Sequence, residues 1–417
     1  MNNKTIKKII CIVMAVLMLI GMVACSSKQE EDKLPNVVQL KLPNDFYHEF
    51  QEYVIDSDIA NGNFVISPVS FRNAMASATY GASGETQKEL LAAMGFHGIN
   101  EYQEWINAIN EFSIIYTYGQ EAYDNGTWKE LSLKQAKDGT IYSLVNTVWQ
   151  NDTFSANLFN EQYVKDINEK FGISLNHSNA DTLVTDVNDF VASNTRKLIP
   201  EILSPDTDVS KIPALFINTL YFKSNWKTPL TYVEAYNGNF RTYKGETVQK
   251  EYMKTQDMFP YYKDKNTELV VLSLQDGVYM AVVKGDIDNI YDKISQTAIK
   301  RIRLSVPRFE IETSVNEEVF DGYLTKMGVK TAFTSDGDFS TMTNDKRFHL
   351  DSVIQKNKID VNEKGVEAAS ASVVIGYGNT SVQEYIELTF DSTYTFFIYT
   401  VDDNNNYETM FFGQIAE

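Results

Sequence analysis

The sequence predicts an α+β fold, and three observations support this prediction. Two helical patterns come early in the chain, strand-like runs follow at irregular intervals, and no repeat or Pro/Gly-rich linker divides residues 37–417. Helices that alternate irregularly with strands are typical of α+β proteins rather than of doubly wound α/β sheets. The 417 residues, 43% apolar and 22% charged, have the composition of a globular protein with a sizeable core.

The N-terminus predicts a signal peptide. Three lysines among the first eight residues precede an uncharged run over 9–24, which is short for a membrane span of about 20 residues. The segment Met22–Cys25 resembles a bacterial lipobox, in which the cysteine becomes the acylated first residue. We therefore expect a lipoprotein signal peptide over 1–24, lipidation of Cys25 and a flexible polar tether over 25–40. An uncleaved anchor helix is the alternative.

This layout predicts an extracytoplasmic, cell-surface protein that is held to the membrane through its lipid or released as a secreted form. Lys and Arg total 37 against 56 Asp and Glu, and the net charge of −19 becomes −22 once the three lysines of the signal peptide are removed. Such a charge repels nucleic acid and anionic lipid headgroups. Both cysteines lie within the first 25 residues, so no disulfide is expected in the body.

The first clear helix begins after Ser67, whose side chain can accept from the free amides of a first turn. Pro68 suits the first helical position, apolar residues then recur at helical spacing, and Gly81 ends the pattern. A second helix is predicted over 85–94, where it would bury its leucines and Met94.

Strand-like runs rich in β-branched and aromatic residues follow. They occupy residues 141–149, 214–222, 269–272, 278–283, 302–309, 395–401 and 410–415. The run 214–222 is apolar nearly throughout, which predicts a strand in a sheet that is covered on both faces. The turn-rich segment 402–406 predicts a hairpin connection, and the polar, glycine-containing segment 116–140 predicts an insertion or long loop.

Motifs of catalysis and cofactor binding are absent from the sequence. It contains no Gly-x-Ser-x-Gly elbow, no His-Glu-x-x-His, no phosphate-binding P-loop and no dinucleotide fingerprint. The four histidines are scattered singly, and Tyr407 stands where a Ca²⁺ loop starting at Asp402 would need glycine. We therefore expect no cofactor, no metal and no enzymatic activity.

One segment near the C-terminus combines small side chains with a strand-compatible pattern. After Glu367, every side chain from Ala368 to Ser372 is small, so the segment could enter a sheet without steric obstruction. The alternation would place two sets of side chains on opposite faces. The first set is Val366, Ala368, Ser370 and Ser372, and the second is Glu367, Ala369 and Ala371.

The motif Glu363-x-Gly-Val-Glu-Ala-Ala-x-Ala371 resembles the hinge of the reactive-centre loop in the serpin family. Further stretches resemble serpin motifs and fall in family order. They are residues 63–70, 187–188, 195–199, 218–226, 306–309, 338–340 and 411–413. The resemblance covers about residues 40 to 417. It implies a single serpin domain over 41–417, with three β-sheets, about eight or nine helices and an exposed reactive-centre loop.

The resemblance also implies roles for individual residues. Ser67, Ser70 and Asn188 match the polar cluster under the main sheet, the shutter, in which Gln355 stands where the family often has histidine. Trp226 matches the tryptophan of the breach, where the loop enters the sheet. The hinge would comprise Glu363, Gly365, Val366, Glu367, Ala368, Ala369, Ser370, Ala371 and Ser372.

The function that the resemblance implies is suicide-substrate inhibition of serine proteases, with cysteine proteases as a further target class. A protease attacks the loop, and the cleaved loop inserts into the main sheet while the acyl-enzyme is still intact. The inserting face carries no charged, bulky or proline residue, which favours an inhibitory protein over a non-inhibitory one. The expected partner is the target protease, bound covalently to a monomer. The alternative is a non-inhibitory surface lipoprotein of the same fold that binds a ligand.

The position of the reactive bond depends on how the loop is counted. Counting forward from Glu363 at family spacing places the bond at Asn379–Thr380. Counting back from Phe390 places it at Val382–Gln383, and Ser381 lies between the two positions.

The loop composition restricts the target. Residues 365–382 contain no Lys or Arg, which argues against a trypsin-like protease, because its pocket places an aspartate opposite a cation. Small and β-branched residues such as Thr380 and Val382 suit elastase-like or subtilisin-like pockets.

Overall fold

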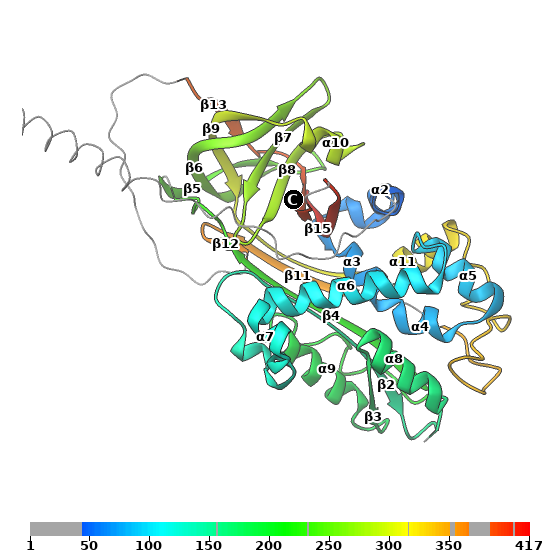
Figure 1. The fold of residues 1–417 in the computed structure, drawn as a ribbon. Coiled ribbons are helices and arrows are strands. Elements are labelled where there is room, and N and C mark those ends of the chain that lie inside the picture. Colours follow the sequence, from blue (N-terminus) through cyan, green and yellow to red (C-terminus); the bar gives the residue numbers. More distant parts are fainter. Residues whose placement is uncertain are drawn as a thin grey trace, which may run out of the picture. The chain divides into compact units, whose positions relative to one another are not determined.

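In the computed structural model, the described residues are 44–417 except 156, 232, 316, 351–354, 367–383 and 403–404. They form a mixed fold of helices and two hydrogen-bonded sheets (Figure 1). The predicted α+β class is therefore confirmed. The helices are α2 (Asn44–Ile55), α3 (Pro68–Ala74), α4 (Ala76–Gly81), α5 (Gly84–Ala93), α6 (Ile99–Tyr118), α7 (Gln120–Asn125), α8 (Glu161–Phe171), α9 (Leu183–Asn194), α10 (Ile290–Ser295) and α11 (Glu317–Lys326).

The smaller sheet includes Gly365 and Val366, which belong to the start of the predicted hinge. Its strands, in spatial order, are β10 (Phe309–Val315), β11 (Gln355–Asn362), β12 (Gly365–Val366), β4 (Ala214–Asn225), β2 (Ile141–Asn151) and β3 (Ser174–Ser178). Strands β2 and β4 form a long antiparallel pair, and β11 pairs antiparallel with both β10 and β12.

The larger sheet lies beside it. Its strands, in order, are β1 (Phe64–Ile66), β15 (Tyr407–Ile415), β14 (Tyr394–Val401), β8 (Val278–Gly285), β7 (Thr267–Ser273), β6 (Thr247–Lys263), β9 (Ala298–Pro307) and β13 (Ile386–Thr389), with β5 (Val233–Arg241) paired to β6. The 17-residue β6 pairs with β5 and β9 along most of its length and with β7 at its end. Through β6, these strands form one continuous sheet, so the described residues form two hydrogen-bonded sheets where the resemblance implied three.

The predicted helix start is confirmed in atomic detail. Ser67 is the N-cap of α3, its hydroxyl accepts from the Ser70 N–H at 3.1 Å, and Pro68 opens the helix. The pattern that runs on to Gly81 forms two helices rather than one, because the chain turns at Met75, whose N–H bonds to the Asn73 carbonyl.

Two boundary predictions were wrong. The run 302–309 is not one strand: β9 ends at Pro307, and the N–H of Arg308 bonds to the Glu251 carbonyl at 2.8 Å before the chain passes into β10 of the other sheet. The segment 116–140 is not a structureless loop, since it contains the end of α6, the helix α7 and two 3₁₀ turns.

Short helical pieces and a glycine turn form the segment between 116 and 140. Gly119, at φ +94°, separates α6 from α7 in a conformation that favours glycine. The buried Leu133 then packs with Ile141 and Tyr221, which fixes the segment against the start of β2.

Both faces of the smaller sheet are covered at β4, as predicted. On one face, the α9 side chains Leu183, Val187 and Val191 form a buried cluster with Trp149 and Ile217 of the sheet. The helices α3 and α6 contact the sheet as well. The Ser113 hydroxyl of α6 accepts from the Leu144 N–H of β2 at 2.9 Å.

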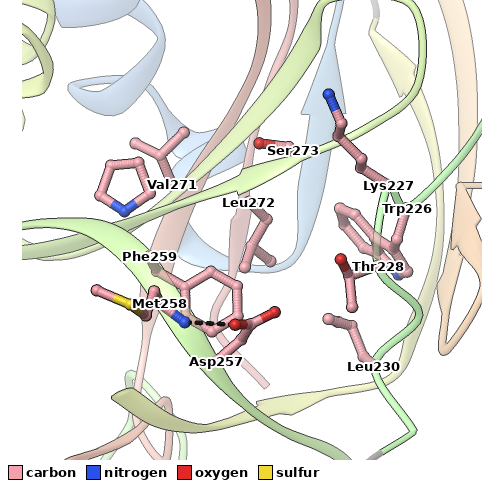
Figure 2. A pocket seen from close by; sticks show the side chains of 11 residues that line it. Trp226, Lys227, Thr228, Leu230, Asp257, Met258, Phe259, Val271, Leu272 and Ser273 are labelled. Carbon is pink, nitrogen blue, oxygen red and sulfur yellow. Dashed lines mark hydrogen bonds between the residues drawn. The ribbon is translucent and has the colours of Figure 1, made fainter. Parts of the chain in front are cut away.

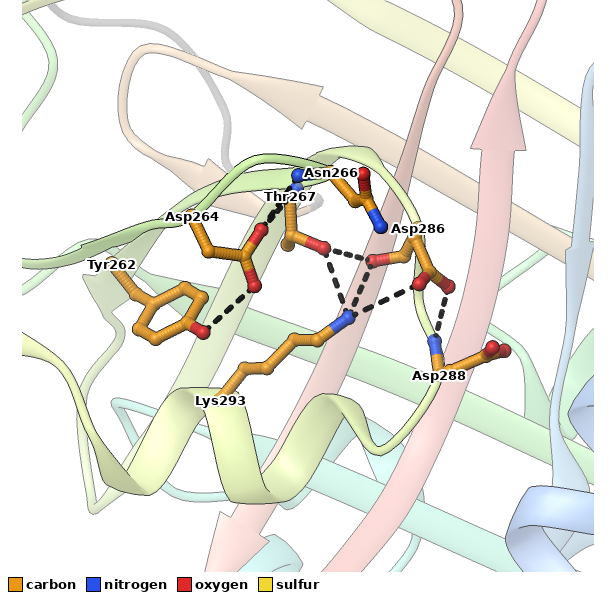
Figure 3. A network of polar contacts seen from close by, with 7 residues as sticks. All are labelled: Tyr262, Asp264, Asn266, Thr267, Asp286, Asp288 and Lys293. Carbon is orange, nitrogen blue, oxygen red and sulfur yellow. Dashed lines mark hydrogen bonds and ion pairs between the residues drawn. The ribbon is translucent and has the colours of Figure 1, made fainter.

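A polar network fixes α10 to the larger sheet (Figure 3). Lys293 of α10 donates to the Thr267 hydroxyl at 2.9 Å and to the Asp286 carbonyl at 3.2 Å. Nearby, a Cβ on Gly285 would lie 2.0 Å from the Asn266 carbonyl oxygen, so the end of β8 requires glycine. We regard this network as structural. Among the helices that the structure describes, none is long and apolar enough to cross a membrane.

Candidate functional site

The predicted hinge begins as a strand inside the smaller sheet. Gly365 and Val366 form β12, which pairs antiparallel with β11 on one side and with β4 on the other (Figure 1). Val366 lies opposite Val361 of β11 and Ser224 of β4. The chain leading to residue 367 therefore already occupies a central position between two long strands.

The hinge residues fit this position closely. Val366 is 1% exposed. A Cβ on Gly365 would lie 2.1 Å from the Ser224 carbonyl oxygen and 2.6 Å from the Asn225 Cα, so glycine lets the strand approach β4.

Trp226 holds the turn that precedes β12. Its backbone N–H donates to the Lys364 carbonyl at 2.6 Å, and its indole Nε1–H donates to the Asn362 carbonyl at 2.8 Å. The Leu230 N–H donates to the Glu363 carbonyl at 2.8 Å. Three successive carbonyls of the turn are therefore bound by the segment that follows β4, and the indole is 3% exposed.

An ion pair ties the same turn to the neighbouring strands. Arg308 pairs with Glu363 and, at 2.9 Å, with Glu251 of β6. Beside this pair, burial and the neighbouring Glu310 carboxylate raise the pKa of Asp360. Arg308 therefore gives Glu363, the first residue of the hinge motif, a positive partner.

A buried polar cluster lies under the smaller sheet, where α3 meets β11. The Gln355 amide forms two hydrogen bonds with the backbone of Ser67, accepting from its N–H at 3.2 Å and donating to its carbonyl at 3.1 Å. Asn357 donates to the Gln355 Oε1 at 2.6 Å. The structure thus brings Ser67 and Gln355 together, as the resemblance implies.

The cluster continues across the sheet through residues that the sequence reasoning did not select. Ser70 bonds to the Asn218 side chain of β4, and Asn218 donates to Asn146 of β2 at 2.5 Å and to Asn73 at 3.3 Å. Asn146 donates in turn to the Asn73 carbonyl at 2.6 Å. A signal for Asn218 was present, since a polar residue interrupts the apolar run 214–222.

Asn188 does not take the place that the resemblance gave it. Its side chain donates to the Leu203 carbonyl at 2.9 Å and accepts from the N–H groups of Ile202 and Leu203 at 2.9 and 3.0 Å. These bonds fix α9 to the segment after it, and Asn218 supplies the amide that contacts Ser70. The assignment of Asn188 to the cluster is therefore corrected to Asn218.

The rest of the predicted site lies outside the described residues. This applies to the hinge beyond Val366, to the reactive-bond candidates between Asn379 and Gln383, and to Cys25. In the part of the chain that is described, no group of His, Cys, Asp or Glu side chains is arranged to hold a metal ion.

The family follows from comparison with known proteins. Residues 41–417 match the family model described as serpin (serine protease inhibitor). The chain belongs to the serpin family. It is 24% identical to neuroserpin from Homo sapiens, over 81% of this chain and 82% of that protein. It is 26% identical to the leukocyte elastase inhibitor from Bos taurus, over 85% and 93%.

Solved structures have the same fold. The native-state structure of tengpin, a thermophilic serpin, matches with a TM-score of 0.73 at 20% identity, covering 89% of this chain and 92% of that one. Thyroxine-binding globulin in complex with thyroxine matches with a TM-score of 0.70 at 17% identity, covering 89% and 97%. The serpin fold implied by the sequence motifs is thus confirmed.

Proposed function

We propose that this serpin inhibits serine proteases as a suicide substrate. The observation that carries the proposal is β12, a strand already placed between β11 and β4 with its buried side chain on the core face. Both neighbours of a longer inserted strand are therefore in position. Neuroserpin and the leukocyte elastase inhibitor, both similar over most of this chain, support inhibition as the activity.

The register of β12 defines the inserted state. If both ladders continued by two residues, Ala368 would lie between Phe222 and Ile359. Two residues further, Ser370 falls between Leu220 and Asn357. These partner residues are buried, so an inserted strand needs small side chains at these positions, and the hinge provides them.

The next position reaches the polar cluster. In the same register, Ser372 falls between Asn218 and Gln355, the two side chains that link the cluster to β4 and β11. A serine can exchange hydrogen bonds with both amides. About a dozen new ladder bonds at about 1 kcal/mol each would contribute on the order of 10 kcal/mol. This is comparable with the stability of an ordinary domain.

The proposed targets are elastase-like or subtilisin-like proteases, because residues 365–382 carry no Lys or Arg. Incubation with either class should give a covalent complex that survives a denaturing gel, and a trypsin-like protease should not. Sequencing the released C-terminal fragment locates the bond and decides between Asn379–Thr380 and Val382–Gln383. Cleavage of the loop by every active protease without a complex would instead favour a non-inhibitory binding protein.

We further propose that the protein is a surface lipoprotein acylated at Cys25. The basic start, the apolar run over 9–24 and the lipobox-like Met22–Cys25 support this. Metabolic labelling with a fatty-acid analogue should label the protein, and Cys25→Ser should abolish the label. A labelled Cys25→Ser variant, or an unlabelled wild type, would contradict the anchor.

A further inference from the structure

A small cavity lies beside Trp226 and Leu230, the residues that bind the turn before β12. It measures about 110 Å³ and is lined by the segment after β4, by β6 and by β7 (Figure 2). Its walls are mainly apolar, and the side chains used below are Trp226, Leu230, Asp257, Met258 and Leu272. A closed apolar cavity of about 150 Å³ accommodates benzene, so this smaller but solvent-open one can take one ring or a short branched chain.

The polar groups at the mouth indicate the charge of a ligand. Asp257 is exposed; one of its oxygens accepts from the Met258 N–H at 2.7 Å, and the other points toward the side that carries Thr228 and Leu230 (Figure 2). Lys227 lies on the opposite side, and its amine is directed away from Asp257 (Figure 2). A carboxylate at the mouth of an apolar cavity favours a cation with an apolar body.

The apolar walls give such a body its contacts. Met258 is 54% exposed, which is unusual for a large apolar side chain, and it lies at the edge of the cavity. Leu272 and the Trp226 ring are buried and form the inner wall.

The cavity is connected to the hinge through the residues that line it. Trp226 presents its ring to the cavity while its two N–H groups hold the carbonyls of Asn362 and Lys364. Leu230, also in the wall, holds the Glu363 carbonyl. A molecule in the cavity gains its apolar contacts only while Trp226 and Leu230 stay in place, so its binding stabilises the anchored hinge.

We propose that this cavity is a binding site for a small apolar ammonium ion, with the ammonium on Asp257 and the apolar body against Trp226, and that occupancy restrains the hinge. The site and its coupling to the hinge do not depend on inhibition. Only an effect of the ligand on protease trapping rests on the proposed function.

The test uses three probes of the same shape and different charge: benzylamine, benzyl alcohol and benzoate. Titration calorimetry should detect benzylamine, with a dissociation constant on the order of millimolar. Benzyl alcohol should bind more weakly and benzoate least. Asp257→Asn should weaken benzylamine roughly tenfold, whereas Asp181→Asn, at an exposed aspartate elsewhere, should not. Equal binding of benzoate, or no effect of Asp257→Asn, would overturn the site.

Hydrogen exchange tests the coupling in the same samples. At a benzylamine concentration about ten times the dissociation constant, exchange at the Trp226 and Leu230 amides should slow by roughly tenfold, as ligand linkage requires. Unchanged exchange at a saturated site would overturn the coupling. Neither measurement contains a protease, so its failure is distinguishable from a failure of inhibition.

Discussion

At the scale of single residues, Val366 is the decisive position of the hinge. It is buried between Ser224 and Val361, and Arg there would bring a charge into the core face of the sheet. We expect Val366→Arg to convert the inhibitor into a substrate, raising the moles of inhibitor needed per mole of protease severalfold. Val366→Thr keeps the size and the β-branch, and should retain the wild-type stoichiometry. An unchanged stoichiometry in Val366→Arg would count against insertion.

A second residue-scale prediction concerns pH. Glu408 of β15 receives a hydrogen bond from Tyr47, and its Oε2 is buried without a hydrogen-bond partner among the described residues. Burial raises the pKa of Glu408 to about 7, and Arg72 only partly opposes this. Tyr142 and Tyr291 also face the carboxylate.

The sign follows from linkage. An unfolded glutamate has a pKa of about 4.3, so between there and about 7 the folded state holds a proton that the unfolded state has lost. As pH rises from about 4 to about 8, the buried Glu408 therefore lowers the free energy of unfolding by on the order of 3 kcal/mol. Glu408→Gln should have a wild-type melting temperature near pH about 4 and a higher one near pH about 8. A melting difference that does not grow with pH would contradict the burial.

At the scale of elements, the polar cluster joins α3 to three strands, and Asn218 and Asn188 offer a matched comparison. Removing the Asn218 amide deprives the Ser70 hydroxyl and the Asn146 Oδ1 of the hydrogen bonds they make with it, at a cost of about 2 kcal/mol. We expect Asn218→Ala to speed hydrogen exchange in β2 and β11. Asn188→Ala should act on the amides of Ile202 and Leu203 instead. Equal effects of both variants on β11 would place Asn188 back in the cluster.

The helices and strands also show which structural features sequence patterns predict and which they do not. Ser67 and Pro68 predicted the start of α3 because capping is decided by neighbouring residues. The Asn188 assignment failed because a polar residue on a helix can serve either side of it, and only the tertiary structure shows which backbone it caps. Likewise, the break between β9 and β10 depends on the Arg308–Glu251 contact, which joins residues far apart in sequence.

At the scale of the whole molecule, the proposed function depends on the smaller sheet and on the loop that follows β12. The hinge motif identified the fold and the segment that we propose to insert, because small side chains in a strand-compatible pattern are visible in sequence. The register of β12 against β4 and β11 could not be predicted from the sequence pattern. It depends on the pairing of Val366 with Ser224 and Val361. In the proposed inserted state, this register would bring Ser372 opposite Asn218 and Gln355.

The most direct test of loop insertion is the melting temperature before and after a single cut within residues 367–383. A protease that cleaves there without forming a complex provides the cut sample, and gel analysis confirms that both fragments remain associated. If the loop becomes a central strand, the new ladder contributes on the order of 10 kcal/mol, and the melting temperature should rise by tens of degrees. An unchanged or lower melting temperature would contradict insertion between β11 and β4.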